Sequence, residues 1–213
     1  KNIIAFSAAI TSCEKAAEWS QALALFVEMG AHFVKPDAIS YNAVMSACEK
    51  GGEWVQALEI LSRAEDSTVE PNIVSYSAAI SACEKCGEWD EALELLRRMA
   101  RANNELSTIT CNAAISACGI GRVWDKALEL LSRMASDSIE SDRISYCAAI
   151  SACERGGQWD EAVALLGKMA RNSVEVDAIA CSAAIHACGS SGEWDKALAL
   201  LRRMAKDRIE TSS

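Results

Sequence analysis

The tryptophans of this 213-residue chain recur at one fixed interval, and that interval constrains the fold more than any other feature. Each lies 35 residues after the previous one, and one cysteine and one alanine of each interval keep the same register. The residues are Trp19, Trp54, Trp89, Trp124, Trp159 and Trp194; Cys13, Cys48, Cys83, Cys118, Cys153 and Cys188; and Ala22, Ala57, Ala92, Ala127, Ala162 and Ala197. A fixed period of this length indicates tandem structural repeats. The chain therefore divides into repeats 3–37, 38–72, 73–107, 108–142, 143–177 and 178–212.

Each repeat has the pattern of two helices. In the third repeat, Tyr76, Ile80 and Cys83 are spaced as one apolar face of a first helix, which a glycine turn ends. The second helix is expected to bury Trp89, Ala92, Leu93, Leu96 and Met99. One helix pair cannot bury both of its faces, so neighbouring pairs must stack. We therefore expect an all-α fold, a right-handed α-solenoid superhelix of tandem helix-turn-helix repeats with a concave and a convex side.

The residues of the second repeat, "AISYNAVMSACEKGGEWVQALEILSRAEDSTVEPN" (38–72), resemble the pentatricopeptide repeat. The shared features are the aliphatic pair, the Tyr-Asn, the Lys before a glycine turn, the Ala-Leu of the second helix and the closing Pro-Asn. The resemblance covers essentially the whole chain. Two features depart from it, because the penultimate proline occurs only at Pro36 and Pro71, and the fourth-position aromatic is replaced by Cys111 and Cys181.

The resemblance implies binding of single-stranded RNA, one base per repeat, in organellar RNA processing, stabilisation or translation. In the family, the second residue of each repeat clamps a base from its faces. These residues are Ile4, Ile39, Val74, Ile109, Ile144 and Ile179. Their stiff, branched side chains suit contact with a flat base. Ordinary packing within the first helix is the alternative interpretation.

The fifth and last residues of each repeat read the base in this family. The resemblance implies that the pair Ser7 and Asp37 reads guanine, the pair Asn42 and Asn72 reads cytosine, and the pair Asn112 and Asp142 reads uracil. Ser77 with Ser107 and Ser182 with Ser212 are weak combinations, and Cys147 with Asp177 lies outside the usual scheme. The implied footprint is 5′-G-C-N-U-N-N-3′.

The net charge of −9 is unusual for an RNA-binding protein, which needs to attract phosphates. The negative residues lie mainly in the turns, second helices and linkers, which the family places on the convex side. The thirteenth position faces the phosphates in the family, and it carries Lys15, Lys50, Lys85 and Arg155. The alternative is that each cation pairs with a neighbouring Glu at a helix end.

The acidity also keeps open a second function, an α-solenoid scaffold that holds proteins together within a larger organellar assembly. Binding of short RNAs at two salt concentrations would separate the two functions. An enzyme is not expected, because neither His32 nor His186 belongs to a recurring constellation and no phosphate loop or nucleophile motif occurs. Membrane insertion is not expected, since no apolar run reaches 18 residues. Nor do we expect a small-molecule substrate or a cofactor.

The ten cysteines do not indicate a disulfide framework, because six of them are explained by the repeat as small core residues. Cys83 and Cys86 have a Cys-x-x-Cys spacing, but five of the six repeats lack the second thiol, so no metal centre is expected. Free thiols fit a reducing compartment. Family habit points to the mitochondrion or plastid. Because Lys1 and Asn2 resemble the end of a preceding repeat and neither end has a polar cap, we expect a segment of a longer array.

Overall fold

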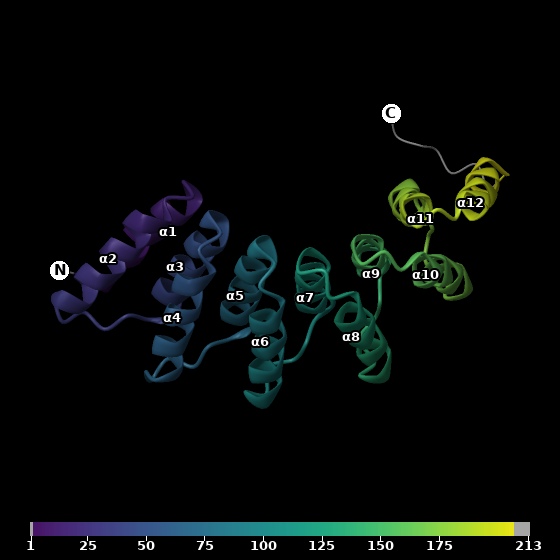
Figure 1. Cartoon of the computed structure of the whole chain (residues 1–213). Coiled ribbons are helices and arrows are strands. Elements are labelled where there is room, and N and C mark those ends of the chain that lie inside the picture. The colour runs from purple at the N-terminus through teal and green to yellow at the C-terminus, as the bar shows by residue number, and fades with distance from the viewer. Residues whose placement is uncertain (1, 207–213) are drawn as a thin grey trace. The chain divides into compact units, whose positions relative to one another are not determined.

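The computed structural model describes residues 2–206, and that part of the chain consists of α-helices joined by short turns and linkers (Figure 1). The longest of these helices have 14 residues, and none of the described helices has the length and apolar character to cross a membrane. No strand occurs within residues 2–206. The predicted all-α fold of tandem helix pairs is therefore confirmed.

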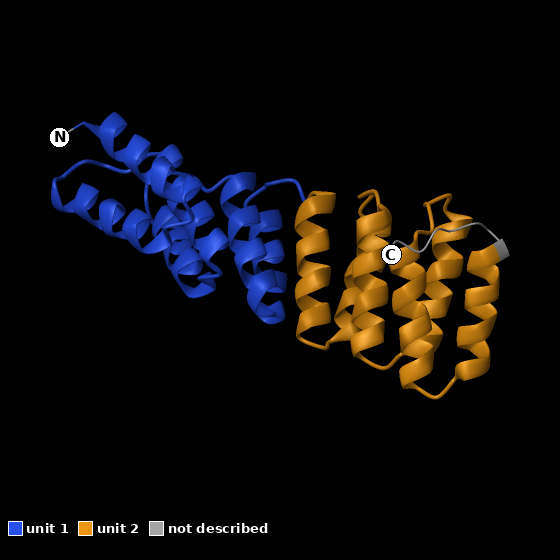
Figure 2. Ribbon diagram, turned by 90° about the horizontal axis from the view of Figure 1, so that it is seen from above, with its two compact units in different colours: residues 1–106 blue, residues 107–213 orange. Residues whose placement is uncertain are grey.

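Contacts divide the chain into two compact units, residues 1–106 and 107–213 (Figure 2). The helices of the first unit are α1 (Ile3–Lys15), α2 (Trp19–Ala31), α3 (Ala38–Gly51), α4 (Trp54–Glu65), α5 (Ile73–Cys86) and α6 (Trp89–Arg101). Those of the second unit are α7 (Thr108–Ile120), α8 (Trp124–Ser136), α9 (Arg143–Arg155), α10 (Trp159–Arg171), α11 (Ala178–Ser190) and α12 (Trp194–Lys206).

The helices of each unit form two layers. In the first unit, α1 packs on α3 and α3 packs on α5, so the first helices of successive repeats touch directly. The second helices α2 and α4 each contact the first helix of their own repeat and that of the next, but among the described residues of this unit they do not contact one another. The second unit repeats this arrangement with α7, α9 and α11 as its directly packed layer. Small residues such as Ala79 and Ala82, both fully buried, allow the first helices to approach this closely.

A left-handed residue follows each of the six first helices, at the fifteenth position of the repeat. Gly52 and Gly87 adopt φ values of 73° and 74°, as the sequence predicted for the glycine turns. In two repeats a side chain must take this conformation instead, at Ala17 with φ 58° and at Arg122 with φ 60°. In the fourth repeat Gly121 stays in the right-handed region, and Arg122, the next residue, is the left-handed one.

The core follows the predicted apolar faces with one correction. Tyr76, Ile80 and Cys83 are buried, as expected for the first helix of the third repeat. In α6 the prediction was wrong for Trp89 and Leu93, which are only half-buried. The buried stripe of α6 consists of Ala92, Leu95, Leu96 and Met99. Positions separated by three, four and seven residues share a helix face, and Leu93 lies about 100° away from Ala92, at the edge of that face.

A tryptophan of the second helix fills a different role, at the junction with the next repeat. Trp19 lies against Gly51 so closely that a Cβ atom at Gly51 would be 2.5 Å from Trp19 Cδ1. Trp124 meets Gly156 in the same way in the second unit. At these two junctions the fourteenth position is small because the tryptophan of the preceding repeat occupies the space. This is the position that Cys86 holds in the third repeat.

The cysteines are free thiols, and five of the six repeated ones are fully buried, whereas Cys13 is half-buried. Burial raises the pKa of the Cys83 thiol to about 12, so it stays protonated. Cys86 is exposed, and its thiol donates a hydrogen bond to the Gly52 carbonyl across 3.1 Å. The two members of the Cys-x-x-Cys spacing therefore have different environments and different partners.

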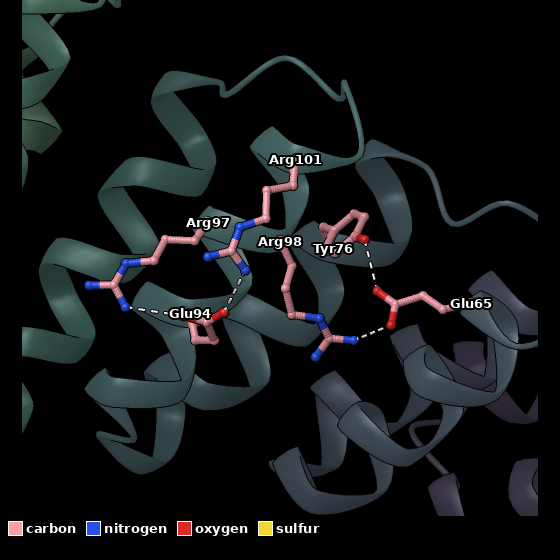
Figure 3. Close-up of polar contacts among 6 residues, drawn as sticks. All are labelled: Glu65, Tyr76, Glu94, Arg97, Arg98 and Arg101. Atoms are coloured by element: carbon pink, nitrogen blue, oxygen red, sulfur yellow. Dashed lines mark hydrogen bonds and ion pairs between the residues drawn. The ribbon is translucent and has the colours of Figure 1, made fainter.

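Polar side chains also join successive repeats, as Figure 3 shows for the second and third. The Tyr76 hydroxyl donates to Glu65 Oε1 across 2.9 Å, and Arg98 pairs with the other oxygen of the same carboxylate. Burial, with the adjacent Glu65 carboxylate, raises the pKa of Tyr76 to about 12. Glu94 lies between Arg97 and Arg101 on α6 (Figure 3). Glu65 thus links the end of α4 to both helices of the following repeat.

Candidate nucleic-acid interface

The predicted clamp residues form a set of exposed apolar side chains, one near the beginning of each first helix. Their exposed fractions run from 53% at Val74 to 74% at Ile109. The full set is Ile4, Ile39, Val74, Ile109, Ile144 and Ile179. Because every one of them is exposed, the alternative that they pack within the repeat does not hold. They are branched apolar side chains placed where a ligand can reach them.

The last residue of each repeat caps the first helix of the next one. Side-chain oxygens of Asp37, Asn72, Ser107, Asp142 and Asp177 accept hydrogen bonds from backbone N–H groups three residues ahead, at 2.8–3.3 Å. Ser212, the last of the predicted base-reading residues, lies outside the described residues. A helix N-cap prefers Ser, Asp and Asn for this purpose. These predicted base-reading residues are therefore held by a backbone hydrogen bond.

A third polar residue, which the sequence analysis missed, joins the fifth and last positions. It is the hydroxyl at the third position of the following repeat. Ser145 Oγ donates to Asn112 Oδ1 at 2.6 Å and lies 2.9 Å from Asp142 Oδ1. Ser75 Oγ lies 2.7 Å from Asn42 Oδ1 and 3.3 Å from Asn72 Oδ1. The signal in the sequence was a Ser or Thr three residues after four of the N-caps, Asp37, Asn72, Ser107 and Asp142, which is the spacing of a capping box.

The first repeat has the same arrangement with a serine in the fifth position. Ser7 Oγ lies 3.1 Å from Ser40 Oγ, and Ser40 Oγ donates to Asp37 Oδ1 at 2.5 Å. Burial alone would raise the pKa of the Asp37 carboxyl, but hydrogen bonds from the side chain and backbone of Ser40 lower it below its usual range. The pKa of Asp142 is lowered in the same way, by Ser145 and Asn112 against the effect of burial. Both carboxylates are therefore held in the ionised form.

The other predicted base-reading residues are arranged differently. Ser77 donates to the Ile73 carbonyl of its own helix at 2.6 Å, and Ser182 is exposed. The Cys147 thiol lies 3.7 Å from Asp177 Oδ1, and Asp177 Oδ2 pairs with Arg143 at 2.6 Å. Both oxygens of Asp177 therefore have protein partners.

The four thirteenth-position cations are exposed. Lys50 donates to the carbonyl and to Oε1 of Glu14, at 3.0 and 2.7 Å, and Lys85 donates to the Glu49 carbonyl at 2.6 Å. For Lys50, the alternative of pairing with a Glu at a helix end describes the contact, although Glu14 belongs to the preceding repeat. The contact of Lys85 is with a backbone carbonyl. An ammonium group has three donors, so these contacts leave donors on both lysines. The remaining two cations are Lys15 and Arg155.

No group of three or more His, Cys, Asp or Glu side chains that could hold a metal ion occurs within residues 2–206. His186 Nδ1 lies 2.7 Å from Glu154 Oε1, and this pair is at the surface. The polar groups that the repeats bring together are therefore hydrogen-bonding side chains rather than metal ligands.

Sequence comparison identifies the family. The pentatricopeptide repeat domain matches residues 1–51 and 24–85, the PPR repeat family matches 71–119, and the PPR repeat matches 109–139, 144–174 and 179–209. This chain belongs to the pentatricopeptide repeat family. A search of curated proteins finds no match.

Solved structures of pentatricopeptide repeat proteins have the same fold. The protein PPR10 from maize is 26% identical with a TM-score of 0.79, and the match covers 100% of this chain and 30% of PPR10. The chain thus spans less than a third of that relative. The PPR domain of Arabidopsis thaliana protein-only RNase P 1, in complex with tRNA, is 17% identical with a TM-score of 0.67 over 79% of this chain and 89% of that domain. PPR10 in complex with an 18-nt psaJ RNA element is 15% identical with a TM-score of 0.51, and the match covers 99% of this chain and 41% of that PPR10 chain.

Proposed function

We propose that this pentatricopeptide repeat chain binds single-stranded RNA, one base per repeat, at the beginnings of its first helices. The observation that carries the proposal is the combination found there. An exposed branched side chain such as Ile109 stands three residues before a hydrogen-bonded polar residue such as Asn112. Apolar faces and polar edges are the two features of an unpaired base that a protein can contact.

The capping bonds explain how uracil could be selected in the fourth repeat. Asn112 Nδ2 donates to Asp142 Oδ1 across 3.2 Å, which fixes the orientation of the amide and leaves its second N–H as a donor. Among the described residues, Asp142 uses Oδ1 for Ser145 and Asn112, which leaves Oδ2 as an acceptor. One donor and one acceptor match the carbonyl oxygen and the N3–H of uracil.

The second repeat differs at the last position, and the difference favours cytosine. Asn72 Oδ1 accepts from the Val74 and Ser75 backbone N–H groups at 3.0 and 3.2 Å. Its amide nitrogen is then the group left to face a base, and it can only donate. Cytosine presents an unprotonated N3 that accepts such a bond, whereas the N3–H of uracil would oppose it. In the first repeat, the remaining oxygen of Asp37 suits the donors of a guanine edge.

The footprint that follows is 5′-G-C-N-U-N-N-3′, with selection at three nucleotides. Each base contact would contribute about 1–3 kcal/mol of discrimination, by analogy with bidentate contacts in DNA grooves. The third repeat is unselective because Ser77 with Ser107 is a weak combination, and the fifth because Asp177 is paired with Arg143. The thirteenth-position cations would contact phosphates with a shallow salt dependence, since few cations take part.

The solved relatives support RNA as the ligand, because their structures include PPR10 with an RNA element and an RNase P domain with tRNA. Pentatricopeptide repeats therefore also occur in an enzyme, and we propose that these repeats contribute binding rather than catalysis. Location in the mitochondrion or plastid remains a prediction from the family, whose relatives include the nuclear RNase P 2 of A. thaliana.

A protein scaffold is the second candidate, and the net charge of −9 is the observation that favours it. Exposed apolar side chains such as Ile4 would then contact a partner protein instead of bases. Mutation distinguishes the two functions, because we do not expect binding of a protein partner to depend on the hydrogen bonds of Asn112 and Asp142.

The test is binding of the oligonucleotide 5′-GCAUAA-3′ and of its complement at about 50 and 200 mM salt, the range over which phosphate contacts lose affinity. We expect tighter binding of 5′-GCAUAA-3′ at both concentrations and weaker binding of both RNAs at the higher one. Equal binding of the two sequences, or no binding, would contradict the proposal. Ile39→Ser with Ile109→Ser should weaken binding of both RNAs, because the clamp contacts any base.

A further inference from the structure

We propose that the third-position hydroxyls Ser40, Ser75 and Ser145 are positioning residues for base selection in the preceding repeat. This inference rests on the proposed function. Each of these serines comes from the helix that follows the repeat whose base it would influence. A reading unit would then consist of three side chains from two repeats rather than of two side chains.

The contacts of the serine Oγ recur in three repeat junctions. The serine Oγ lies between the fifth-position side chain and the N-cap side chain in each, as given above for Ser7, Asn42 and Asn112. The serines are 0–3% exposed, so these contacts are shielded from bulk water. A buried hydroxyl that contacts both reading side chains restricts the orientation of both.

The amides show what this restriction achieves. An asparagine side chain can present either a donor or an acceptor, depending on which way its amide is turned. Asn112 Oδ1 is engaged by Ser145 and its Nδ2 by Asp142, so the outward group is an N–H. Asn42 Oδ1 likewise accepts a hydrogen bond from Ser75 Oγ. Without the hydroxyl, the amide could turn its oxygen outward and accept from a base instead of donating to it.

The junction between the fifth and sixth repeats lacks the hydroxyl. The fifth and last residues of the fifth repeat, Cys147 and Asp177, are not joined there in the way that Asn112 and Asp142 are. Ala180 stands at the third position that follows the fifth repeat. The Cys147 thiol makes only a long contact of 3.7 Å to Asp177, and Arg143 pairs with the outer oxygen of that carboxylate. The repeat whose fifth and last residues fall outside the usual scheme is thus also one without a positioning hydroxyl.

A second role of the same hydroxyls must be separated from this one. Ser75 Oγ accepts from the Asn72 backbone N–H at 3.2 Å, and Ser145 Oγ accepts from that of Asp142 at 3.2 Å, which completes the capping boxes. Loss of a capping box lowers helix stability and would weaken binding of all RNAs alike. Loss of positioning would change the preference at one nucleotide only.

The experiment compares S75A, S145A, S75T and the unsubstituted chain on RNAs that carry each of the four bases at the second or fourth nucleotide of 5′-GCAUAA-3′. We expect S75A to reduce the preference at the second nucleotide at least fivefold while the preference at the fourth is kept, and S145A to do the reverse. S75T should behave like the unsubstituted chain, because Thr110 forms the same capping box with Ser107. Unchanged preferences in S75A and S145A, or an equal loss at both nucleotides in each variant, would overturn the inference alone. If the unsubstituted chain shows no preference at all, the proposed function fails and the inference fails with it.

Discussion

The hydroxyl of Ser145 donates a hydrogen bond to Asn112 Oδ1 across 2.6 Å, although the two residues belong to successive repeats. Their repeat boundary is also where Asp142 caps α9 and accepts from Asn112. A single buried cluster therefore serves the beginning of a helix, the contact between two repeats and the orientation of two proposed base-reading groups. Each of these roles makes a prediction.

The fifth repeat should gain selectivity if the missing groups are supplied. Cys147→Asn with Ala180→Ser provides an amide and a hydroxyl, and Arg143→Ala removes the partner of Asp177 Oδ2. We expect the triple variant to prefer uracil at the fifth nucleotide by about tenfold, which corresponds to about 1.4 kcal/mol. Cys147→Asn alone is the control and should give a smaller preference. Equal preferences in the two variants would show that neither the hydroxyl nor a free carboxylate oxygen matters.

The stability of the chain should fall as the pH drops below about 4. Hydrogen bonds lower the pKa of Asp37 and Asp142 in the folded state below the ordinary value for aspartate. The unfolded chain therefore takes up these protons at a higher pH than the folded one, so their stabilising contribution is present above the unfolded pKa and is lost as the pH falls through the folded one. Denaturant unfolding at pH 7 and at about pH 3 measures the change.

Asp142→Asn is the matched variant for this pH effect, because asparagine also caps a helix but does not titrate. Its unfolding free energy at pH 7 should stay within about 0.5 kcal/mol of the unsubstituted value. The loss on going to pH 3 should be smaller than in the unsubstituted chain. An identical loss would mean that Asp142 makes no contribution to the acid sensitivity.

Ala17 is strained, and relieving the strain should stabilise the first repeat. Its φ of 58° costs a residue with a Cβ about 1–2 kcal/mol, and glycine avoids this cost while losing some entropy on folding. We expect Ala17→Gly to raise the unfolding free energy by about 0.5–1 kcal/mol. Gly87→Ala, at φ 74°, makes the opposite change at the equivalent turn and should destabilise by a similar amount. The sign of the two effects, measured by denaturant unfolding, decides the prediction.

A cavity of about 270 Å³ lies beside Cys181, one of the two cysteines that replace the fourth-position aromatic. It is lined by Leu166, Ala170, Val176, Cys181, Leu200, Arg203 and Met204. Tyr146 at the equivalent position of the preceding repeat is 2% exposed. Cys181→Tyr should fill the space and raise the unfolding free energy by about 1–2 kcal/mol. Cys181→Ala, which adds no volume, should not stabilise, and a destabilised Cys181→Tyr would show that the cavity cannot accept a ring.

The sequence alone was sufficient for the helices but not for the way in which they meet. The period of 35 residues and the spacing of Tyr76, Ile80 and Cys83 predicted tandem helix pairs with a buried first-helix face. Burial of Trp89 and Leu93 was predicted wrongly, since apolar spacing within one helix does not show which positions lie at the edge of its buried face. Contacts between successive repeats are not visible in that spacing either. Trp19 against Gly51 illustrates such a contact, which joins residues 32 positions apart.

The residues of the candidate site could be predicted from the sequence, but the hydrogen bonds that join them across repeats could not. The family resemblance named the clamp residues and the polar pairs. The link from Asn42 to Ser75 spans 33 residues, and only the stacking of one repeat on the next brings these side chains together. No local pattern within a single repeat contains that information.

The proposed reading of bases depends on which group the N-cap residue leaves free, and one exchange tests this most directly. Asp142→Asn keeps the cap and replaces an acceptor by a donor, while Asn72→Asp makes the reverse change. Binding is measured with uracil or cytosine at the second and at the fourth nucleotide. We predict that Asp142→Asn changes the preference at the fourth nucleotide from uracil to cytosine, and that Asn72→Asp changes the second from cytosine to uracil. Preferences that stay as they are in both variants, with the unsubstituted chain selective, would contradict the account.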